Sequence, residues 1–273
     1  MPKKVLITGV YGLIGSIIYD RLVAQPDAYE VYGLARRRSP SERVATGKRI
    51  EIPDERFTLS DLRDLAVLER AMAGIDVVVH MAADPRLEAG WESILASNLI
   101  GTRNVFEAAR RSGVQRVIYA SSVTVNWGTL LYEEPYSLIY QGRYDELSPA
   151  DVPMITVEQP PRPISYYPAS KVWGEALARV YADTHGLSMI CLRIGGVNAE
   201  DRPPFDEGWG RSAWLSQRDV AQMVQRAVEA PDDLRYGVFY VVSNNTWRWV
   251  DIDSARVELG YAPQDNAEDW LTK

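Results

Sequence analysis

The stretch Val5-Leu6-Ile7-Thr8-Gly9-Val10-Tyr11-Gly12-Leu13-Ile14-Gly15 decides the fold of this chain. It is typical of a buried strand, a turn with three glycines, and a helix running from about Gly12 to Ala24. A helix that starts at such a turn offers free N–H groups and a positive dipole end to a pyrophosphate. We assign Gly9 to the turn, Gly12 to close approach of the backbone, and Gly15 to helix–strand packing. The alternative is a plain strand–helix turn that uses glycine sterically.

Beyond this stretch, apolar runs of strand length alternate with longer segments of helical period. The expected strands are residues 31–35, 56–59, 76–80, 116–120, 188–193 and 237–242. The expected helices are residues 62–72, 91–111, 170–184 and 217–229. Uniformly apolar strands separated by helices indicate a parallel sheet covered on both faces. The pattern therefore predicts an α/β fold, a Rossmann-type doubly wound parallel sheet of about seven strands with a small C-terminal substrate-binding lobe.

We predict one domain over residues 1–273 with two functional parts. The cofactor-binding core comprises residues 1–125, 165–194 and 216–242. The substrate lobe comprises three segments that interrupt the alternation, residues 126–164, 195–215 and 243–273. Two of these segments directly follow strands, and open α/β sheets bind ligands at the carboxyl ends of their strands. Because the segments are short, we expect a small substrate.

Composition and charge exclude several classes of protein. Of 273 residues, 46% are hydrophobic and 25% charged, as in ordinary globular proteins. A net charge of -7 gives no general attraction to nucleic acid or to an anionic membrane, so we expect neither partner. No apolar run is long enough to span a membrane, no signal peptide is evident, and Cys191 is the one cysteine, so we expect a cytoplasmic location. One cysteine and two histidines, His80 and His185, make a zinc site improbable, so we expect no metal.

Further motifs follow the glycine turn in a fixed order. They are Asp61-Leu62, His80-Met81-Ala82-Ala83, Asn98-x-x-Gly101-Thr102-x-Asn104-Val105, Ser121-Ser122 and Tyr167-x-x-x-Lys171. With the Gly-x-x-Gly-x-x-Gly spacing, they resemble the short-chain dehydrogenase/reductase superfamily in its extended branch, the NAD-dependent epimerase/dehydratase family. The resemblance runs from about residue 3 to residue 198.

The resemblance implies a set of cofactor contacts and a catalytic group. The implied cofactor-binding residues are Gly9, Tyr11, Gly12, Leu13, Ile14, Gly15, Asp61, Leu62, Ala82, Ala83, Tyr167 and Lys171. The implied catalytic residues are Ser122, Tyr167, Lys171 and Asn98.

The spacing of Tyr167 and Lys171 suits an acid–base role. Tyrosine has a reference pKa of about 10 and is a poor base at neutral pH by itself. An ammonium group four residues along the same helix face, together with an oxidised nicotinamide, favours the phenolate. Tyr167 then takes the proton of a substrate hydroxyl, and Ser122 holds the reacting oxygen. The alternative is an exposed helix pair without chemistry.

The end of the second expected strand bears on the choice of nicotinamide cofactor. An acidic residue there would hold the ribose hydroxyls of NAD. This chain has Arg36 and Arg37 instead, and guanidinium groups pair with a 2′-phosphate. We therefore predict NADP as the cofactor, with NAD bound beside a solvated basic loop as the alternative.

The C-terminal part resembles the uronate dehydrogenases, which oxidise the anomeric carbon of a hexuronic acid using NAD. The resembling runs are Leu192-Arg193-Ile194-Gly195, Ser212-Ala213-Trp214-Leu215-Ser216-Gln217-Arg218-Asp219 and Gly260-Tyr261-Ala262-Pro263-Gln264-Asp265-Asn266-Ala267-Glu268. The chain departs from that subgroup in four places. It has Arg36 where the subgroup has Asp, Val123-Thr124 where the subgroup has Asn-His, and Gly196 where the subgroup has Ser. Its segment 126–164 is also longer. Candidate substrate contacts are Arg86, Ser122, Val123, Thr124, Arg193, Gly196 and Arg211.

These observations predict an NAD(P)-dependent oxidoreductase acting on a free monosaccharide or sugar acid. Two alternatives stay open: a nucleotide-sugar epimerase, dehydratase or reductase, and a cofactor-binding sensor without turnover. The family resemblance also implies a homodimer through the helices at 91–111 and 170–184. An apolar stripe of Val172, Ala176 and Val180 fits that arrangement.

Overall fold

Seven parallel strands form one sheet in this computed structural model, which describes residues 1–271. The strands are β1 (Lys3–Thr8), β2 (Tyr29–Ala35), β3 (Phe57–Leu59), β4 (Val77–His80), β5 (Arg116–Ser122), β6 (Ser188–Ile194) and β7 (Tyr236–Val241). Their order is β3-β2-β1-β4-β5-β6-β7, and every neighbouring pair is parallel. The doubly wound sheet predicted from the sequence is confirmed.

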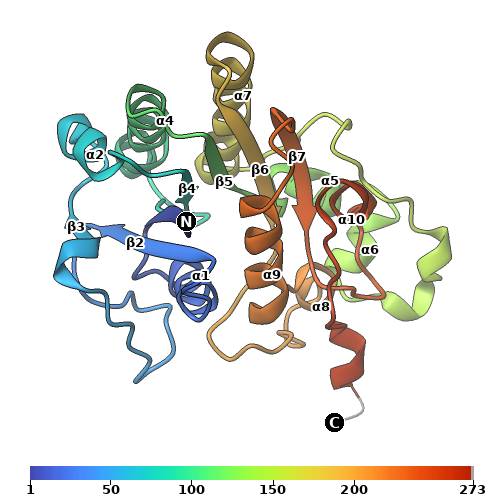
Figure 1. The fold of residues 1–273 in the computed structure, drawn as a ribbon. Coiled ribbons are helices and arrows are strands. Elements are labelled where there is room, and N and C mark those ends of the chain that lie inside the picture. The colour runs from blue at the N-terminus through green and yellow to red at the C-terminus, as the bar shows by residue number, and fades with distance from the viewer. Residues whose placement is uncertain (272–273) are drawn as a thin grey trace.

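Helices cover both faces of the sheet (Figure 1). They are α1 (Leu13–Val23), α2 (Leu65–Ala71), α3 (Trp91–Ser93), α4 (Gly101–Arg111), α5 (Trp127–Tyr132), α6 (Tyr136–Tyr140), α7 (Tyr166–His185), α8 (Gly210–Ala213), α9 (Gln217–Val228) and α10 (Asp253–Leu259). A π-helical turn, η2 (Ile94–Ile100), joins α3 to α4, and short 3-10 turns occur at η1 (Asp54–Arg56), η3 (Val123–Asn126), η4 (Tyr144–Glu146), η5 (Pro149–Asp151) and η6 (Ala267–Trp270).

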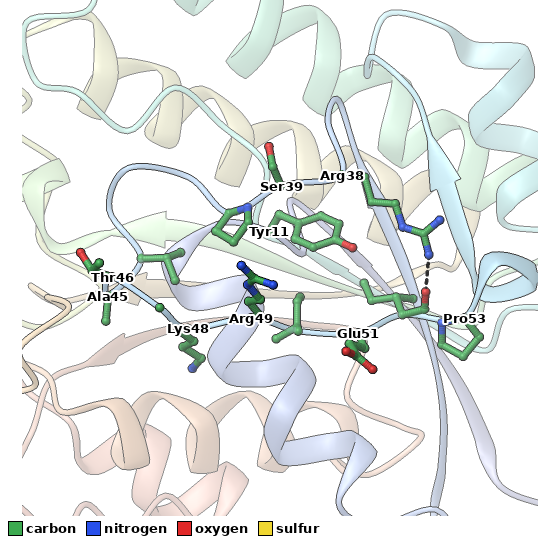
Figure 2. Close-up of a pocket in the computed structure, with 14 residues that line it drawn as sticks. Tyr11, Arg38, Ser39, Ala45, Thr46, Lys48, Arg49, Glu51 and Pro53 are labelled. Carbon is green, nitrogen blue, oxygen red and sulfur yellow. Dashed lines mark hydrogen bonds between the residues drawn. The ribbon is translucent and has the colours of Figure 1, made fainter.

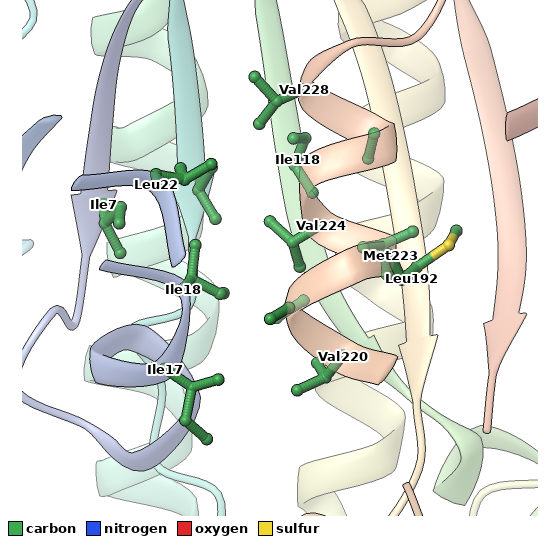
Figure 3. Close-up of a cluster of buried hydrophobic side chains, with 14 of the residues drawn as sticks. Ile7, Ile17, Ile18, Leu22, Ile118, Leu192, Val220, Met223, Val224 and Val228 are labelled. Atoms are coloured by element: carbon green, nitrogen blue, oxygen red, sulfur yellow. The ribbon is translucent and has the colours of Figure 1, made fainter. Parts of the chain in front are cut away.

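The core divides between the two faces because side chains alternate along each strand. Ile7 and Ile118 belong to the face covered by α1 and α9, while Leu6 and Val117 belong to the face covered by α2, α4 and α7. Figure 3 shows the first face, where side chains of α1 and α9 turn toward one another above the strands. With this cover on both sides, ligands have access to the sheet only at its edges.

A third hydrophobic cluster draws on all three segments that interrupt the strand–helix alternation. It includes Trp127 and Ile155 from the first segment, Ala213 from the second and Trp249 from the third, packed on Tyr240 of β7. An isolated bridge of Ile155 with Val250 joins the first segment to the third, and a bridge of Gly196 with Trp214 closes the second segment on itself. The three segments therefore pack together on the last strand of the sheet, and their role as a substrate lobe stays a prediction.

Element boundaries differ from the sequence predictions at two functional helices. The helix predicted at 170–184 starts earlier, at Tyr166, because Pro168 fits the first turn, where a missing N–H costs nothing. The helix predicted at 62–72 starts later, at Leu65, because the side chain of Asp64 accepts a hydrogen bond from Val67 N and caps it there. No helix within residues 1–271 is long and apolar enough to cross a membrane.

Candidate active site

The glycine turn lies at the carboxyl end of β1. Gly9 has a φ of +70°, and a Cβ atom added to it would lie 2.9 Å from the backbone of Ala82. A Cβ atom on Gly15 would lie 2.3 Å from the carbonyl oxygen of Gly9. Both positions therefore require glycine, the first for its left-handed backbone and the second for close packing of α1 on the turn.

The N-terminus of α1 is open to an anion. Its N-cap residue is Gly12, no side chain caps it, and its first turn contains no acidic residue. The first N–H groups of a helix lack intrahelical partners, and the helix dipole favours negative charge there. The turn formed by Gly12, Leu13 and Ile14 thus fits the pyrophosphate of a dinucleotide cofactor.

Asn98 holds the loop after β4 in place. It is 1% exposed and lies in η2, the wide helical turn. Its Oδ1 accepts a hydrogen bond from Asp84 N at 2.8 Å, and its Nδ2 donates to Ser170 Oγ at 3.0 Å. The sequence places Asn98 among the catalytic residues, whereas these contacts are those of a positioning residue.

The other residues of the same helix motif hold the ends of β3 and β4. A Cβ atom on Gly101 would lie 3.0 Å from Leu62, so the helix packs closely against the Asp61-Leu62 loop. Asn104 Nδ2 donates to Leu62 O at 3.1 Å. The hydroxyl of Thr102 lies 3.1 Å from His80 Nε2, whose ring also contacts Thr8 Oγ1 at 2.8 Å. Burial lowers the pKa of His80 to about 3, with a further contribution from Lys171, so its ring is neutral.

Ser122, Tyr167 and Lys171 gather where β5 ends and α7 begins. The Ser122 hydroxyl lies close enough to Tyr167 to lower the pKa of its phenol, and it accepts a hydrogen bond from Thr124 Oγ1 at 2.8 Å. Lys171 Nζ donates to Ala120 O at 2.7 Å and lies 5.5 Å from the centre of the Tyr167 ring. The geometry thus brings together the three side chains that the sequence singles out for proton transfer.

Burial dominates the electrostatics of this group. It raises the pKa of Tyr167, and the hydrogen bond with Ser122 and the charge of Arg43 lower it in part. Burial also lowers the pKa of Lys171 to about 7, while Glu175 opposes that effect. The lysine therefore titrates near neutral pH, and its charge depends on nearby groups.

A cavity of about 940 Å³ lies beside the glycine turn, within the loop that follows β2 (Figure 2). Its lining includes Tyr11, Arg38, Lys48 and Arg49. Arg38 is paired with Asp54, and Ser41 N donates to Tyr11 O at 2.9 Å, which ties the loop to the turn. The cavity is thus lined by cationic side chains on the side where the sequence places Arg36 and Arg37.

Four of the candidate substrate contacts, Arg86, Thr124, Gly196 and Arg211, are at least partly exposed. Arg86 forms an ion pair with Asp84 at 2.6 Å, and the Arg211 guanidinium lies 3.5 Å from the centre of the Tyr144 ring. Gly196 forms a backbone bridge with Trp214.

Val123 and Arg193 require a correction. Each is 3% exposed, Val123 within the lobe cluster and Arg193 in an ion pair with Glu175. Because their side chains are fully engaged inside the protein, direct contact with a substrate does not fit them.

Two charged residues near the site escaped the sequence analysis. Glu175 follows Lys171 by four residues, so the periodicity that links Tyr167 to Lys171 could have found it. Arg43 belongs to the loop after β2, where nothing in the local sequence indicates that its charge acts on Tyr167.

The fold and the arrangement of this site are those of a dinucleotide-dependent oxidoreductase. Residues 5–209 match the model of the NAD dependent epimerase/dehydratase family, and the chain belongs to that family. It is an enzyme of the extended short-chain dehydrogenase/reductase type.

Curated and solved relatives are similar over nearly the whole chain. The NAD-dependent glucose-6-phosphate dehydrogenase of Haloferax volcanii is 33% identical over 99% of this chain and 96% of its own length. L-arabinose 1-dehydrogenase (NAD(P)(+)) of the same organism is 34% identical over 97% of each chain. A solved variant of Agrobacterium tumefaciens uronate dehydrogenase, complexed with NAD, is 27% identical over 100% of this chain and 88% of its own, with a TM-score of 0.75.

Replacing the phenol hydroxyl tests the catalytic group. We expect Tyr167→Phe to lower kcat by about 100-fold or more, the range found when a general acid–base residue is lost. Cofactor affinity, measured by fluorescence titration, should change little because the ring and Lys171 are kept. Tyr166→Phe is the matched control, since Tyr166 is 55% exposed, and should retain activity. Turnover by Tyr167→Phe near the wild-type rate would contradict the assignment.

Proposed function

We propose that this enzyme is an NAD(P)-dependent sugar dehydrogenase that oxidises a hydroxyl-bearing carbon of a free monosaccharide or sugar acid. The observation that carries the proposal is the meeting of Ser122, Tyr167 and Lys171 at the carboxyl end of β5, on the same sheet as the glycine turn after β1. The names of the similar proteins support a sugar as the substrate, since they include glucose-6-phosphate, L-arabinose and uronate dehydrogenases.

The residues of the chain divide the work of this reaction. The nicotinamide, when bound, supplies the acceptor for the hydride of the substrate carbon. Tyr167, as the phenolate, takes the proton from the substrate hydroxyl. Ser122 holds the oxygen of that hydroxyl by a hydrogen bond. The Lys171 ammonium, whose Nζ lies 5.5 Å from the centre of the Tyr167 ring, stabilises the phenolate. We also propose that Asp61, Leu62, Ala82 and Ala83 line the rest of the cofactor cleft.

We propose that Arg211 recognises an anionic group on the substrate. It lies in the lobe, stacked on Tyr144, whereas the other exposed candidate, Arg86, is already paired with Asp84. A guanidinium group binds either a carboxylate or a phosphate. Two relatives, a glucose-6-phosphate dehydrogenase and the uronate dehydrogenases, bear the names of such anionic sugars.

A substrate panel tests the function as a whole. We expect reduced-cofactor absorbance to grow with one or more free aldoses, sugar phosphates or uronic acids, and not with UDP-, GDP- or dTDP-sugars. Tight binding of a nucleotide by calorimetry, with no signal from free sugars, would favour the nucleotide-sugar alternative instead. Cofactor binding with no turnover of any compound would favour a sensor.

For the cofactor, we propose NADP in preference to NAD. Arg36 and Arg37 are exposed after β2, and the adjacent cavity adds Arg49. No carboxylate occupies the position at the end of β2 that would repel a 2′-phosphate. The Haloferax relative named as using NAD(P)(+) is compatible with this choice, although the solved uronate dehydrogenase holds NAD.

A charge reversal at Arg36 measures this preference. We expect Arg36→Asp to lower kcat/KM for NADP by about 10-fold or more, because a carboxylate replaces a charge-assisted bond to the 2′-phosphate and repels it. The ratio of kcat/KM for the two cofactors is the readout. Arg70→Asp, an exposed change on α2, is the control and should leave the ratio unchanged. An unaltered ratio in Arg36→Asp would refute the assignment.

We further propose a homodimer formed through α4 and α7. Trp91, Ile100, Tyr166 and Val180 are all more than two-fifths exposed, and all lie on or beside these two helices. Trp91 and Tyr166 contact each other edge to face at 5.7 Å. An exposed apolar surface of this kind is typical of a protein interface.

A cytoplasmic location also stays a proposal, supported by the buried, free Cys191.

Light scattering tests the dimer. We expect the wild type to show twice its chain mass of 30.7 kDa and Val180→Glu to show the mass of one chain, because a charge is costly in an apolar interface. Val257→Glu is the control, since Val257 is 84% exposed on α10, outside this surface. A wild type that stays monomeric at micromolar concentration would overturn the proposal.

A further inference from the structure

A buried carboxylate lies one helical turn beyond Lys171 on α7. Glu175 is 6% exposed, and its carboxylate accepts two hydrogen bonds from the Arg193 guanidinium on β6, at 2.9 and 2.8 Å. The hydroxyl of Ser121 on β5 donates a third, at 2.5 Å. Glu175 is therefore held in one position from two neighbouring strands.

This carboxylate lies beside the catalytic lysine. Lys171 Nζ bonds to Ala120 O, and the next residue of β5, Ser121, bonds to Glu175. The two side chains of α7 thus reach consecutive residues of one strand, and residues four apart are neighbours on a helix. Both are buried, so their charges are weakly screened by water.

Apart from Glu175, the buried titratable groups on the strands around Lys171 are neutral or cationic, and the charge of Asp84 acts on Tyr167 from the loop after β4. Burial raises the pKa values of Tyr119 on β5 and Cys191 on β6, and His80 on β4 is neutral. Tyr167 on α7 is the group whose phenolate the lysine must stabilise, and Arg193 on β6 is a cation. Asp84 and Arg43 act on Tyr167 from the surrounding loops.

A series of hydrogen bonds leads from the Glu175–Arg193 ion pair into the segment 126–164. Arg193 Nη1 donates to the Tyr240 hydroxyl at 2.9 Å, and that hydroxyl donates to Asn126 Oδ1 at 2.8 Å. Asn126 Nδ2 in turn donates to Pro160 O at 3.1 Å. Asn126 and Pro160 lie near the two ends of the segment 126–164. The position of the Glu175 carboxylate is therefore linked to the position of this segment.

We propose that Glu175, held by Arg193, is a positioning residue that keeps the Lys171 ammonium charged and aimed beside Tyr167. The inference rests on the proposed dehydrogenase function only for the role of Lys171 in turnover. Neutralising Glu175 leaves Arg193 as an unmatched cation near Lys171, which favours loss of the lysine proton.

The protonation of Lys171 can be read without turnover. Acetic anhydride acetylates the neutral amine, so the labelling rate of the Lys171 peptide over a pH series, quantified by mass spectrometry, gives the protonation midpoint. We expect Glu175→Gln to lower that midpoint by about one pH unit, the size of shift that a nearby charge produces. If the enzyme turns over a sugar, kcat should fall at high pH as Lys171 loses its proton. In Glu175→Gln that fall should begin about one pH unit lower than in the wild type.

Two further variants separate this role from a structural one. Glu107→Gln is the matched control: Glu107 is 7% exposed on α4, pairs with Arg110 and Arg111, and accepts from the Tyr181 hydroxyl. It should lose stability without moving the Lys171 midpoint. The double variant Glu175→Gln with Arg193→Met removes both charges, a change that buried pairs tolerate better than loss of one partner. It should fold and show a midpoint that is lowered, because the Glu175 charge is lost, but by less than in the single variant, because the Arg193 cation is removed as well.

An unchanged midpoint in Glu175→Gln, or in the double variant if the single one does not fold, would overturn the proposal and leave Glu175 a structural role only. A wild type that turns over no sugar would instead refute the dehydrogenase function, while the labelling result would still decide the coupling of Glu175 to Lys171.

Discussion

Backbone packs directly against backbone where β1 ends, and the rest of the site depends on that contact. Gly9 lies against Ala82 of the loop after β4, and Gly15 of α1 lies against Gly9. β1 and β4 are neighbours at the point where the strand order reverses direction, so this contact sets the geometry of the crevice between them. A side chain at either glycine would separate the helix, the turn and the loop that together form the cofactor cleft.

Buried polar side chains also hold the elements around the site together. His80 joins Thr8 of β1 to Thr102 of α4, and Asn98 joins the loop after β4 to α7. Buried polar groups are costly unless they are paired, so each of these side chains selects one arrangement of the elements around it. The catalytic side chains are thereby carried on rigid elements, and Tyr167 and Lys171 need little further ordering.

The sequence was sufficient to predict the sheet, the glycine turn and the meeting of Ser122, Tyr167 and Lys171, because these depend on local spacing and on the order of motifs. It was not sufficient where a role depends on contacts distant along the chain. Arg193 reads as a cation in a region that could bind substrate, yet the register of β6 with β5 and β7 places it between Glu175 and Tyr240. Val123 directly follows the catalytic serine but packs into the lobe. The helix predicted at 170–184 starts four residues earlier, at Tyr166, because Pro168 is accommodated in its first turn.

The loop after β2 lies at the opposite end of the cleft from the substrate lobe in the order of the strands, since β2 and β7 are separated by β1, β4, β5 and β6. It is anchored to α1 by the Tyr19 hydroxyl, which donates to Glu51 O at 3.0 Å, and by the ion pair of Lys48 with Asp20. The residues proposed for cofactor preference and for sugar recognition thus lie in separate stretches of the chain, on different strands of one sheet. Either trait can diverge among descendants of this protein while the other is retained.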